Sequence, residues 1–363
     1  MNILHQSTEF NSFGIDALTL ARPDDWHVHV RDGALLKALL PHTAQQFGRA
    51  IIMPNLKPPV TTTEQAAAYR KRILAARPTQ GPGTAFEPLM TLYLTDNTSP
   101  DEIWRARESG FVHGIKLYPA GTTTNSDAGV TDLRHCAVTL EAMQKTSLPL
   151  LVHGEVTDPV VDVFDREEVF IDRVLEPLRR DFPALKVVFE HITTRNAVEY
   201  VRHADTSLGM LGATITAHHL LLNRNTMLVG GIKPHYYCLP IFKREVHRAA
   251  LVEAAISGHP RFFLGTDSAP HLKNFKESSC GCAGCYTALH ALELYAQTFD
   301  EAGALRRLEG FASFHGPDFY GLPRSIDTVT LERSSWTLPE NIDIDGMSVV
   351  VFKMSKDLSW KLR

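Results

Sequence analysis

Eight apolar runs of strand length recur along the chain and alternate with stretches of helical character. The runs cover residues 17–21, 49–54, 86–94, 114–118, 148–153, 185–190, 210–216 and 261–265. The helix-like stretches between most of them are 33–47, 64–76, 100–109, 132–146, 167–181 and 194–203. This alternation favours parallel strands joined by right-handed crossovers, and eight strands close a barrel. The sequence therefore predicts an α/β fold, a (β/α)8 TIM barrel.

The alternative architecture is an open doubly wound sheet, but the first strand-to-helix turn lacks the G-x-G-x-x-G pattern. A chain of 363 residues that is 44% hydrophobic can form one large core. We expect a single domain at 1–363, with its core at about 17–325 and a short C-terminal extension at 326–363 packed on the barrel.

Composition excludes several classes of function. The 37 basic and 41 acidic residues give a net charge of −4, and the basic residues are scattered, so no nucleic-acid surface is expected. No apolar run is long enough for a membrane helix, and Met1–Gln6 lacks the pattern of a signal peptide. Five cysteines, an odd number, fit free thiols in a reducing cytosol, which predicts a cytoplasmic protein.

Polar side chains gather where the first strand is expected to end, at the barrel face that carries catalytic residues. Alternation along an extended chain puts His27, His29 and Arg31 on one face. Two imidazoles so spaced can bind one metal ion, and the arginine can hold a substrate anion beside it. The alternative is a pair of buried histidines satisfied by hydrogen bonds.

Further candidate ligands lie in later strands or just after them: Lys116, His153, His191 and Asp267. Lys116 stands inside an apolar run, so it either pairs with a carboxylate such as Asp267 or is neutral and has reacted with carbon dioxide. The resulting carbamate has two oxygens and could bridge two metal ions about 3.5–4 Å apart. With four imidazoles and Asp267 it would make a ligand set suited to two zinc ions.

Longer motifs carry a family resemblance. They are DDWHVHVRD at 24–32, MPNL at 53–56, GIKLYPA at 114–120, VGGIKP at 229–234 and GTDSAPH at 265–271. With the histidines at the strand ends, they resemble the binuclear amidohydrolases and, among these, the shorter bacterial and fungal type of the dihydroorotase family. The similarity covers about residues 24–323. The one departure is the loop PAGTTTNS at 119–126, which differs slightly from the family pattern but keeps Thr-Thr-Asn.

The resemblance implies a zinc-dependent cyclic amidohydrolase that interconverts N-carbamoyl-L-aspartate and L-dihydroorotate, a step of pyrimidine biosynthesis. It implies two zinc ions per subunit bridged by carboxylated Lys116, one also held by His27, His29 and Asp267, the other by His153 and His191. A hydroxide between the metals would be the nucleophile, and Asp267 the general base and acid.

The resemblance also assigns the substrate contacts. Arg31, Asn55 and His271 would hold the substrate carboxylate, His29 and His153 would contact the substrate, and the backbones of Leu239 and Ala283 would bind the pyrimidine edge. Thr123 and Thr124 would form the tip of a mobile loop that excludes water. The family implies a homodimer acting on a small molecule.

Two other functions stay open. A hydantoinase or allantoinase would share the metal ligands but would not need the carboxylate clamp at Arg31, Asn55 and His271. A non-catalytic barrel would be expected to lose ligands, and here all six are present.

Two groups of residues look less informative. Cys280, Cys282 and Cys285 lack an evident fourth ligand, which favours reduced or structural thiols over a metal site. His218 and His219 are expected on a strand, where adjacent residues face opposite ways and cannot share a metal ion.

Overall fold

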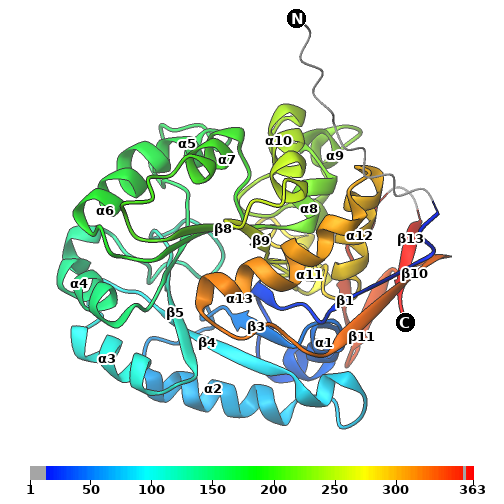
Figure 1. Cartoon of the computed structure of the whole chain (residues 1–363), viewed down its shortest axis with the longest axis horizontal. Helices are drawn as coiled ribbons and strands as arrows, with labels where there is room; N and C mark the ends of the chain where they lie inside the picture. Colours follow the sequence, from blue (N-terminus) through cyan, green and yellow to red (C-terminus); the bar gives the residue numbers. More distant parts are fainter. Residues whose placement is uncertain (1–13, 355–356) are drawn as a thin grey trace, which may run out of the picture.

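Eight parallel strands form the centre of the computed structural model, which describes residues 14–354 and 357–363 (Figure 1). The expectation drawn from Met1–Gln6 lies outside these residues. Neighbouring strands pair in sequence order. They are β2 (Asp25–Val28), β3 (Arg49–Ile52), β4 (Glu87–Tyr93), β5 (Val112–Leu117), β6 (Leu150–His153), β7 (Val187–Glu190), β8 (Leu211–Ile215) and β9 (Phe262–Leu264).

Contacts between the first and last strands close this sheet into the expected barrel. Val28 forms a parallel bridge with Ser268 just beyond β9. The Asp267 backbone N–H donates to the His27 carbonyl over 2.8 Å, and the His29 N–H donates to the Ser268 carbonyl over 3.0 Å. Closure of the barrel therefore brings His27 and His29, near the end of the first strand, next to Asp267, just after the last strand.

Helices cover the outside of the barrel, as the alternating pattern predicts (Figure 1). Local signals explain several starts: the Ser99 hydroxyl caps the first turn before Pro100, and Thr62 forms a capping box with Gln65. The helices are α1 (Gly33–Gln46), α2 (Thr63–Ala75), α3 (Pro100–Glu108), α4 (Ala137–Thr146), α5 (Arg166–Phe170), α6 (Glu176–Asp181), α7 (Arg195–Arg202), α8 (Ala217–Leu221), α9 (Arg224–Leu228), α10 (Glu245–Ile256), α11 (Lys273–Lys276), α12 (Ala291–Glu301) and α13 (His315–Tyr320).

One predicted barrel strand lies elsewhere. The run at 17–21 is a strand, β1 (Ala17–Ala21), but it pairs antiparallel with β10 (Thr328–Trp336), which in turn pairs with β13 (Leu358–Leu362). Its assignment to the barrel was wrong, because an apolar run predicts a strand but does not predict which other strand it pairs with. The barrel instead begins with Asp25–Val28. Two further strands, β11 (Asn341–Ile344) and β12 (Met347–Val350), form an antiparallel pair.

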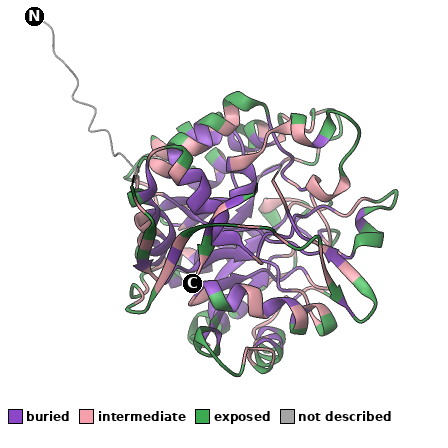
Figure 2. Cartoon of the chain, turned by 90° about the vertical axis from the view of Figure 1, so that its right-hand side faces the viewer, coloured by how far each residue is buried: buried purple, intermediate pink, exposed green. Residues whose placement is uncertain are grey.

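The barrel interior changes character along its axis. One end is filled by a compact apolar cluster in which Trp26 stacks on Tyr320 with ring centroids 4.3 Å apart. Toward the strand C-termini the buried side chains become polar, with Lys116, His153 and Glu190 all inaccessible to solvent or nearly so. Figure 2 shows that burial is concentrated in the strands and the inner sides of the helices. Among the described residues, no helix is both long and apolar enough to cross a membrane.

Candidate active site

A small cavity of about 20 Å³ opens at the C-terminal ends of the strands. It gathers residues from all around the barrel, and most of the sequence-predicted site residues line it. They are His27, His29, Arg31, Asn55, Tyr118, Thr123, Thr124, His153, His191, Leu239, Asp267, Ala269, Ala283 and Gly284. Two predicted residues are not in the lining: Lys116 is fully buried, and His271 contacts Arg31.

Three of these residues have left-handed backbone conformations. Arg31, His191 and Asp267 have φ values of 57°, 41° and 44°, a region that residues other than glycine seldom occupy. Such conformations persist where the surrounding structure enforces them, and they concentrate at functional sites. Here each one follows the end of a barrel strand and turns a polar side chain toward the common cavity.

Three donor atoms converge at the junction of β2 and β9. His27 Nε2 and His29 Nε2 are 3.3 Å apart, and Asp267 Oδ1 lies 3.3 Å from the first and 3.2 Å from the second. Tetrahedral zinc with ligand distances of about 2.0–2.2 Å holds neighbouring donors about 3.4 Å apart. The three atoms are therefore spaced as ligands of one metal ion, and the donor types fit zinc.

The charges around His27 call for a cation. Its Nδ1 lies 3.0 Å from Glu190 Oε1, opposite the Nε2 that faces Asp267. Burial alone would lower the pKa of His27, but the Glu190 and Asp267 carboxylates outweigh it and raise the pKa to about 9. Burial lowers the pKa of His29 to about 4, so that ring is neutral and has a lone pair to offer. A metal ion would supply the positive charge that a proton on His27 otherwise supplies.

Lys116 forms its ion pair with Glu190, not with Asp267 as the sequence suggested. Both partners are completely buried and face the barrel interior. Asp267, the partner offered for the ion-pair alternative, was wrong because β7 contributes an inward carboxylate at its last residue. Burial is the largest influence on Lys116 and lowers its pKa, which eases deprotonation of the amine.

His153 and His191 lie on the other side of the cavity. Their ring centroids are 4.7 Å apart, and the His191 ring is 4.9 Å from that of His27. His153 Nε2 lies 2.9 Å from Glu155 Oε2, whereas His191 Nδ1 is buried with no hydrogen-bond partner in the described part of the chain. Burial lowers the pKa of both rings, which keeps them neutral and able to bind a metal ion.

Arg31 lies beside these groups with its guanidinium fixed from two sides. Its Nε donates to the Pro270 carbonyl over 3.0 Å, and its Nη2 lies 3.0 Å from Nε2 of His271. Burial and the adjacent Arg31 charge lower the pKa of His271 to about 2, so His271 stays neutral. Asn55 Oδ1 lies 2.8 Å from His29 Nδ1. The cationic Arg31 and the neutral His271 and Asn55 therefore lie next to the cluster formed by His27, His29 and Asp267.

The loop that carries Thr123 and Thr124 covers the cavity. Asn55 Nδ2 donates to the Thr124 carbonyl over 3.2 Å, and Asn125 Nδ2 donates to the Asn55 carbonyl over 3.1 Å. A cavity of about 20 Å³ has room for about one water molecule. The structure therefore represents the site with its cover closed.

Sequence reasoning missed several members of the site. Glu190, Glu155, Tyr118 and Asn125 contact or line it without having been assigned a role. Glu190 had a usable signal, since a carboxylate that ends an apolar strand next to a candidate ligand is costly to bury alone. The expectation for His218 and His219 was also wrong: they lie on helix α8, not on a strand.

Comparison with known proteins agrees with this geometry. The model of the amidohydrolase family matches residues 24–331. A curated dihydroorotase of Ralstonia nicotianae is 70% identical over 347 residues, which is 96% of this chain and 99% of the relative. The chain belongs to the amidohydrolase family, among the dihydroorotases.

Solved dihydroorotase structures share the fold along nearly the whole chain. The Campylobacter jejuni dihydroorotase superposes with a TM-score of 0.86 at 37% identity, covering 96% of this chain and 98% of the other. The Saccharomyces cerevisiae dihydroorotase, in complex with 5-fluoroorotic acid, gives a TM-score of 0.88 at 36% identity, with coverages of 96% and 99%. Dihydroorotases act on a cyclic amide, and zinc dependence is a general trait of the amidohydrolase family.

Proposed function

We propose that this chain is a dihydroorotase that interconverts N-carbamoyl-L-aspartate and L-dihydroorotate with exchange of one water molecule. The observation that carries the proposal is the position of Arg31, a cation that lines the same cavity as the His27, His29 and Asp267 cluster. A hydrolytic metal site explains attack on an amide. The adjacent guanidinium explains selection of a substrate that bears a carboxylate.

The donor set supports two metal ions, which we propose to be zinc. His27, His29 and Asp267 would hold one ion, and His153 and His191 the other. We propose that Lys116, as a carbamate formed by addition of its neutral amine to carbon dioxide with release of a proton, bridges both. A carbamate beside Glu190 would repel it unless cations lay between, so carboxylation and metal binding are expected to support each other. When bound, the metals would supply a nucleophilic hydroxide at neutral pH and polarise the amide carbonyl.

The chain's own groups would bind the substrate and move a proton. Arg31, with Asn55 and His271, would hold the carboxylate and so fix the ring relative to Asp267. Asp267 would accept the proton of the attacking water and deliver it to the ring nitrogen as the amide bond breaks. The backbones of Leu239 and Ala283 would bind the polar edge of the pyrimidine ring.

The covering loop would have to move in each cycle. A ring with a carboxylate is far larger than the closed cavity, so Thr123 and Thr124 must withdraw to admit it. The hydrogen bonds between Asn55, Thr124 and Asn125 would reform once the substrate is bound, and they would exclude bulk water.

We further propose that the chain folds as one domain and forms a homodimer in the cytoplasm. Light scattering, which measures the mass of the protein in solution, tests the homodimer.

The direct test is hydrolysis of L-dihydroorotate by purified, zinc-supplied protein, followed through loss of ring-amide absorbance. The control is the same protein after metal removal, checked by circular dichroism for an unchanged fold. Rapid turnover that disappears with the metal and returns on readdition supports the proposal. A folded, metal-loaded sample without turnover would overturn it.

A further inference from the structure

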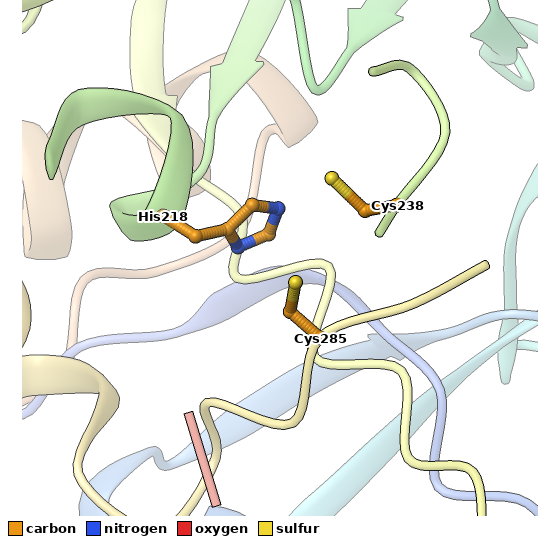
Figure 3. Close-up of side chains that lie close together, drawn as sticks. All are labelled: His218, Cys238 and Cys285. Carbon is orange, nitrogen blue, oxygen red and sulfur yellow. The ribbon is translucent and has the colours of Figure 1, made fainter. Parts of the chain in front are cut away.

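A second group of metal-ligating side chains lies outside the candidate active site. His218, Cys238 and Cys285 are 0%, 1% and 1% exposed, and their ligand atoms all lie within 4.8 Å of one another. They come from helix α8 and from two loops far apart in the sequence. Figure 3 shows both sulfur atoms directed toward the imidazole ring. We propose that these three residues form a separate site for a thiophilic metal ion, Zn²⁺ in particular.

The state of His218 is the first support. Neither of its ring nitrogens has a hydrogen-bond partner among the residues that the structure describes, although the ring is fully buried. The neighbouring His219 differs, since its Nδ1 lies 2.7 Å from the Thr216 hydroxyl and its Nε2 lies 2.9 Å from the Pro240 carbonyl. Burying an unpaired polar atom is unfavourable, and a metal ion would bind one of the two ring nitrogens.

The thiols provide the second support. Thiolate sulfur and imidazole nitrogen are the donors of structural zinc sites. Burial raises the pKa of Cys238 well above its usual range, so without a metal the thiol is protonated and weakly bonded. Zinc binding would displace one proton from each cysteine into solvent. Two thiolates would then neutralise the dication, which removes the main cost of burying it.

Lys276 adds an electrostatic argument. Its ammonium group is held by the carbonyls of Tyr237, Cys282 and Gly284, at 2.7, 2.7 and 2.9 Å. From there it attracts negative charge on Cys238 and Cys285. Burial raises the pKa of Cys238, and the Lys276 charge opposes that rise, which favours the metal-binding thiolate.

The site would join two segments that line the cavity. Cys238 directly precedes Leu239, which lines the cavity. Cys285 directly follows Ala283 and Gly284, which also line it. A metal bound behind them would fix these segments relative to helix α8. The role is structural, because the three ligands are buried and none of them lines the cavity. This inference does not depend on the proposed function.

Cobalt substitution tests the site without relying on activity. The metal-depleted chain is loaded with Co²⁺, and the near-ultraviolet thiolate-to-cobalt charge-transfer band is recorded. The hydrolytic cluster has only nitrogen and oxygen donors, so such a band requires cysteine. We expect the band in the wild type, its loss in Cys238→Ser and Cys285→Ser, and its retention in a Cys280→Ser/Cys282→Ser control. Absence of the band from the wild type, or its loss only in the control, would overturn the proposal.

A second measurement uses only the wild-type chain. It therefore tests the site even if a serine substituted for a buried cysteine prevents folding. X-ray absorption at the zinc edge of the fully loaded wild-type chain would detect sulfur neighbours at about 2.3 Å. We expect that sulfur shell, together with about one zinc equivalent beyond those of the hydrolytic site. A spectrum with nitrogen and oxygen neighbours alone would overturn the site.

Discussion

Glu190 Oε1 lies 3.0 Å from Nδ1 of His27, on the side of the ring opposite the atom that faces Asp267. The same carboxylate pairs with Lys116 through its other oxygen. Glu190 therefore orients two of the proposed metal ligands at once, although it does not itself line the cavity. Carboxylates that hold a ligating histidine in this way commonly tune metal affinity.

We expect Glu190→Gln to weaken metal binding about 10- to 100-fold, because the neutral amide cannot hold the His27 ring as the carboxylate does. Competition with a chromophoric chelator measures this directly. Glu293→Gln, at another buried glutamate that does not line the cavity, is the matched control and should bind metal as the wild type does. Equal affinities for Glu190→Gln and the wild type would remove Glu190 from this role.

We expect Asp267→Asn to lower kcat by about 100-fold or more, because the amide keeps the shape but cannot accept a proton. Asp267→Ala should abolish turnover. Steady-state hydrolysis of L-dihydroorotate, with metal content determined for each sample, separates loss of the base from loss of metal. Circular dichroism should show a native fold for both variants. Near-normal kcat in a metal-loaded Asp267 variant would exclude it as the base.

We expect Arg31→Met to raise KM about 10- to 100-fold, because a charge-assisted contact to the substrate carboxylate is lost. The change in kcat should be smaller. Arg72→Met is a fair comparison, since Arg72 pairs with Asp32 on the surface and should leave KM unchanged. An unaltered KM in Arg31→Met would count against the carboxylate clamp.

The strand ends were the most predictable part of this site. Alternation placed His27, His29 and Arg31 on one face, and all three line the cavity. For His27 and His29 local geometry gives this result, whereas Arg31 reaches the cavity through a left-handed backbone with φ of 57°, beyond the end of β2. The assignment of 17–21 to the barrel failed because pairing is not local: Leu20 faces Val329, more than three hundred residues away in the sequence.

Long-range contacts account for the wrong partner of Lys116 and for the neighbours that the sequence left unassigned. The partner of Lys116 came from β7, and the residues near Cys285 came from α8 and from the loop at 238. Nothing in the spacing of Cys280, Cys282 and Cys285 points to His218. The same holds for Asn125, whose contact with Asn55 depends on how a loop folds over the site. A sequence pattern predicts contacts between such distant residues only when they belong to a motif that is already known.

Stability should depend on pH through Glu293 on α12. Its side chain is 3% exposed, and Oε1 accepts a hydrogen bond from the Leu362 N–H over 3.1 Å, which fixes the end of β13. Burial raises the pKa of Glu293 from 4.5 to about 7. The folded state therefore binds more protons than the unfolded state between these values, so the free energy of unfolding should fall as pH rises from 4.5 to 7.

The size of this effect is about 3 kcal/mol at most. Urea unfolding of the wild type and of Glu293→Gln at several pH values between 4.5 and 7 measures it as a difference. We expect the free energy of unfolding of the wild type, minus that of the variant, to decrease as the pH rises from 4.5 to 7. Parallel pH profiles for the two proteins would show that Glu293 does not titrate in this window.

The central claim is that this site selects a cyclic amide bearing a carboxylate, and one comparison tests it most directly. L-Dihydroorotate and dihydrouracil share the ring and differ only in that carboxylate. We predict that zinc-loaded protein hydrolyses L-dihydroorotate with a kcat/KM at least about 100-fold higher. A ratio near one, or a preference for dihydrouracil, would contradict the assignment and point to a hydantoinase-like specificity on the same metal site.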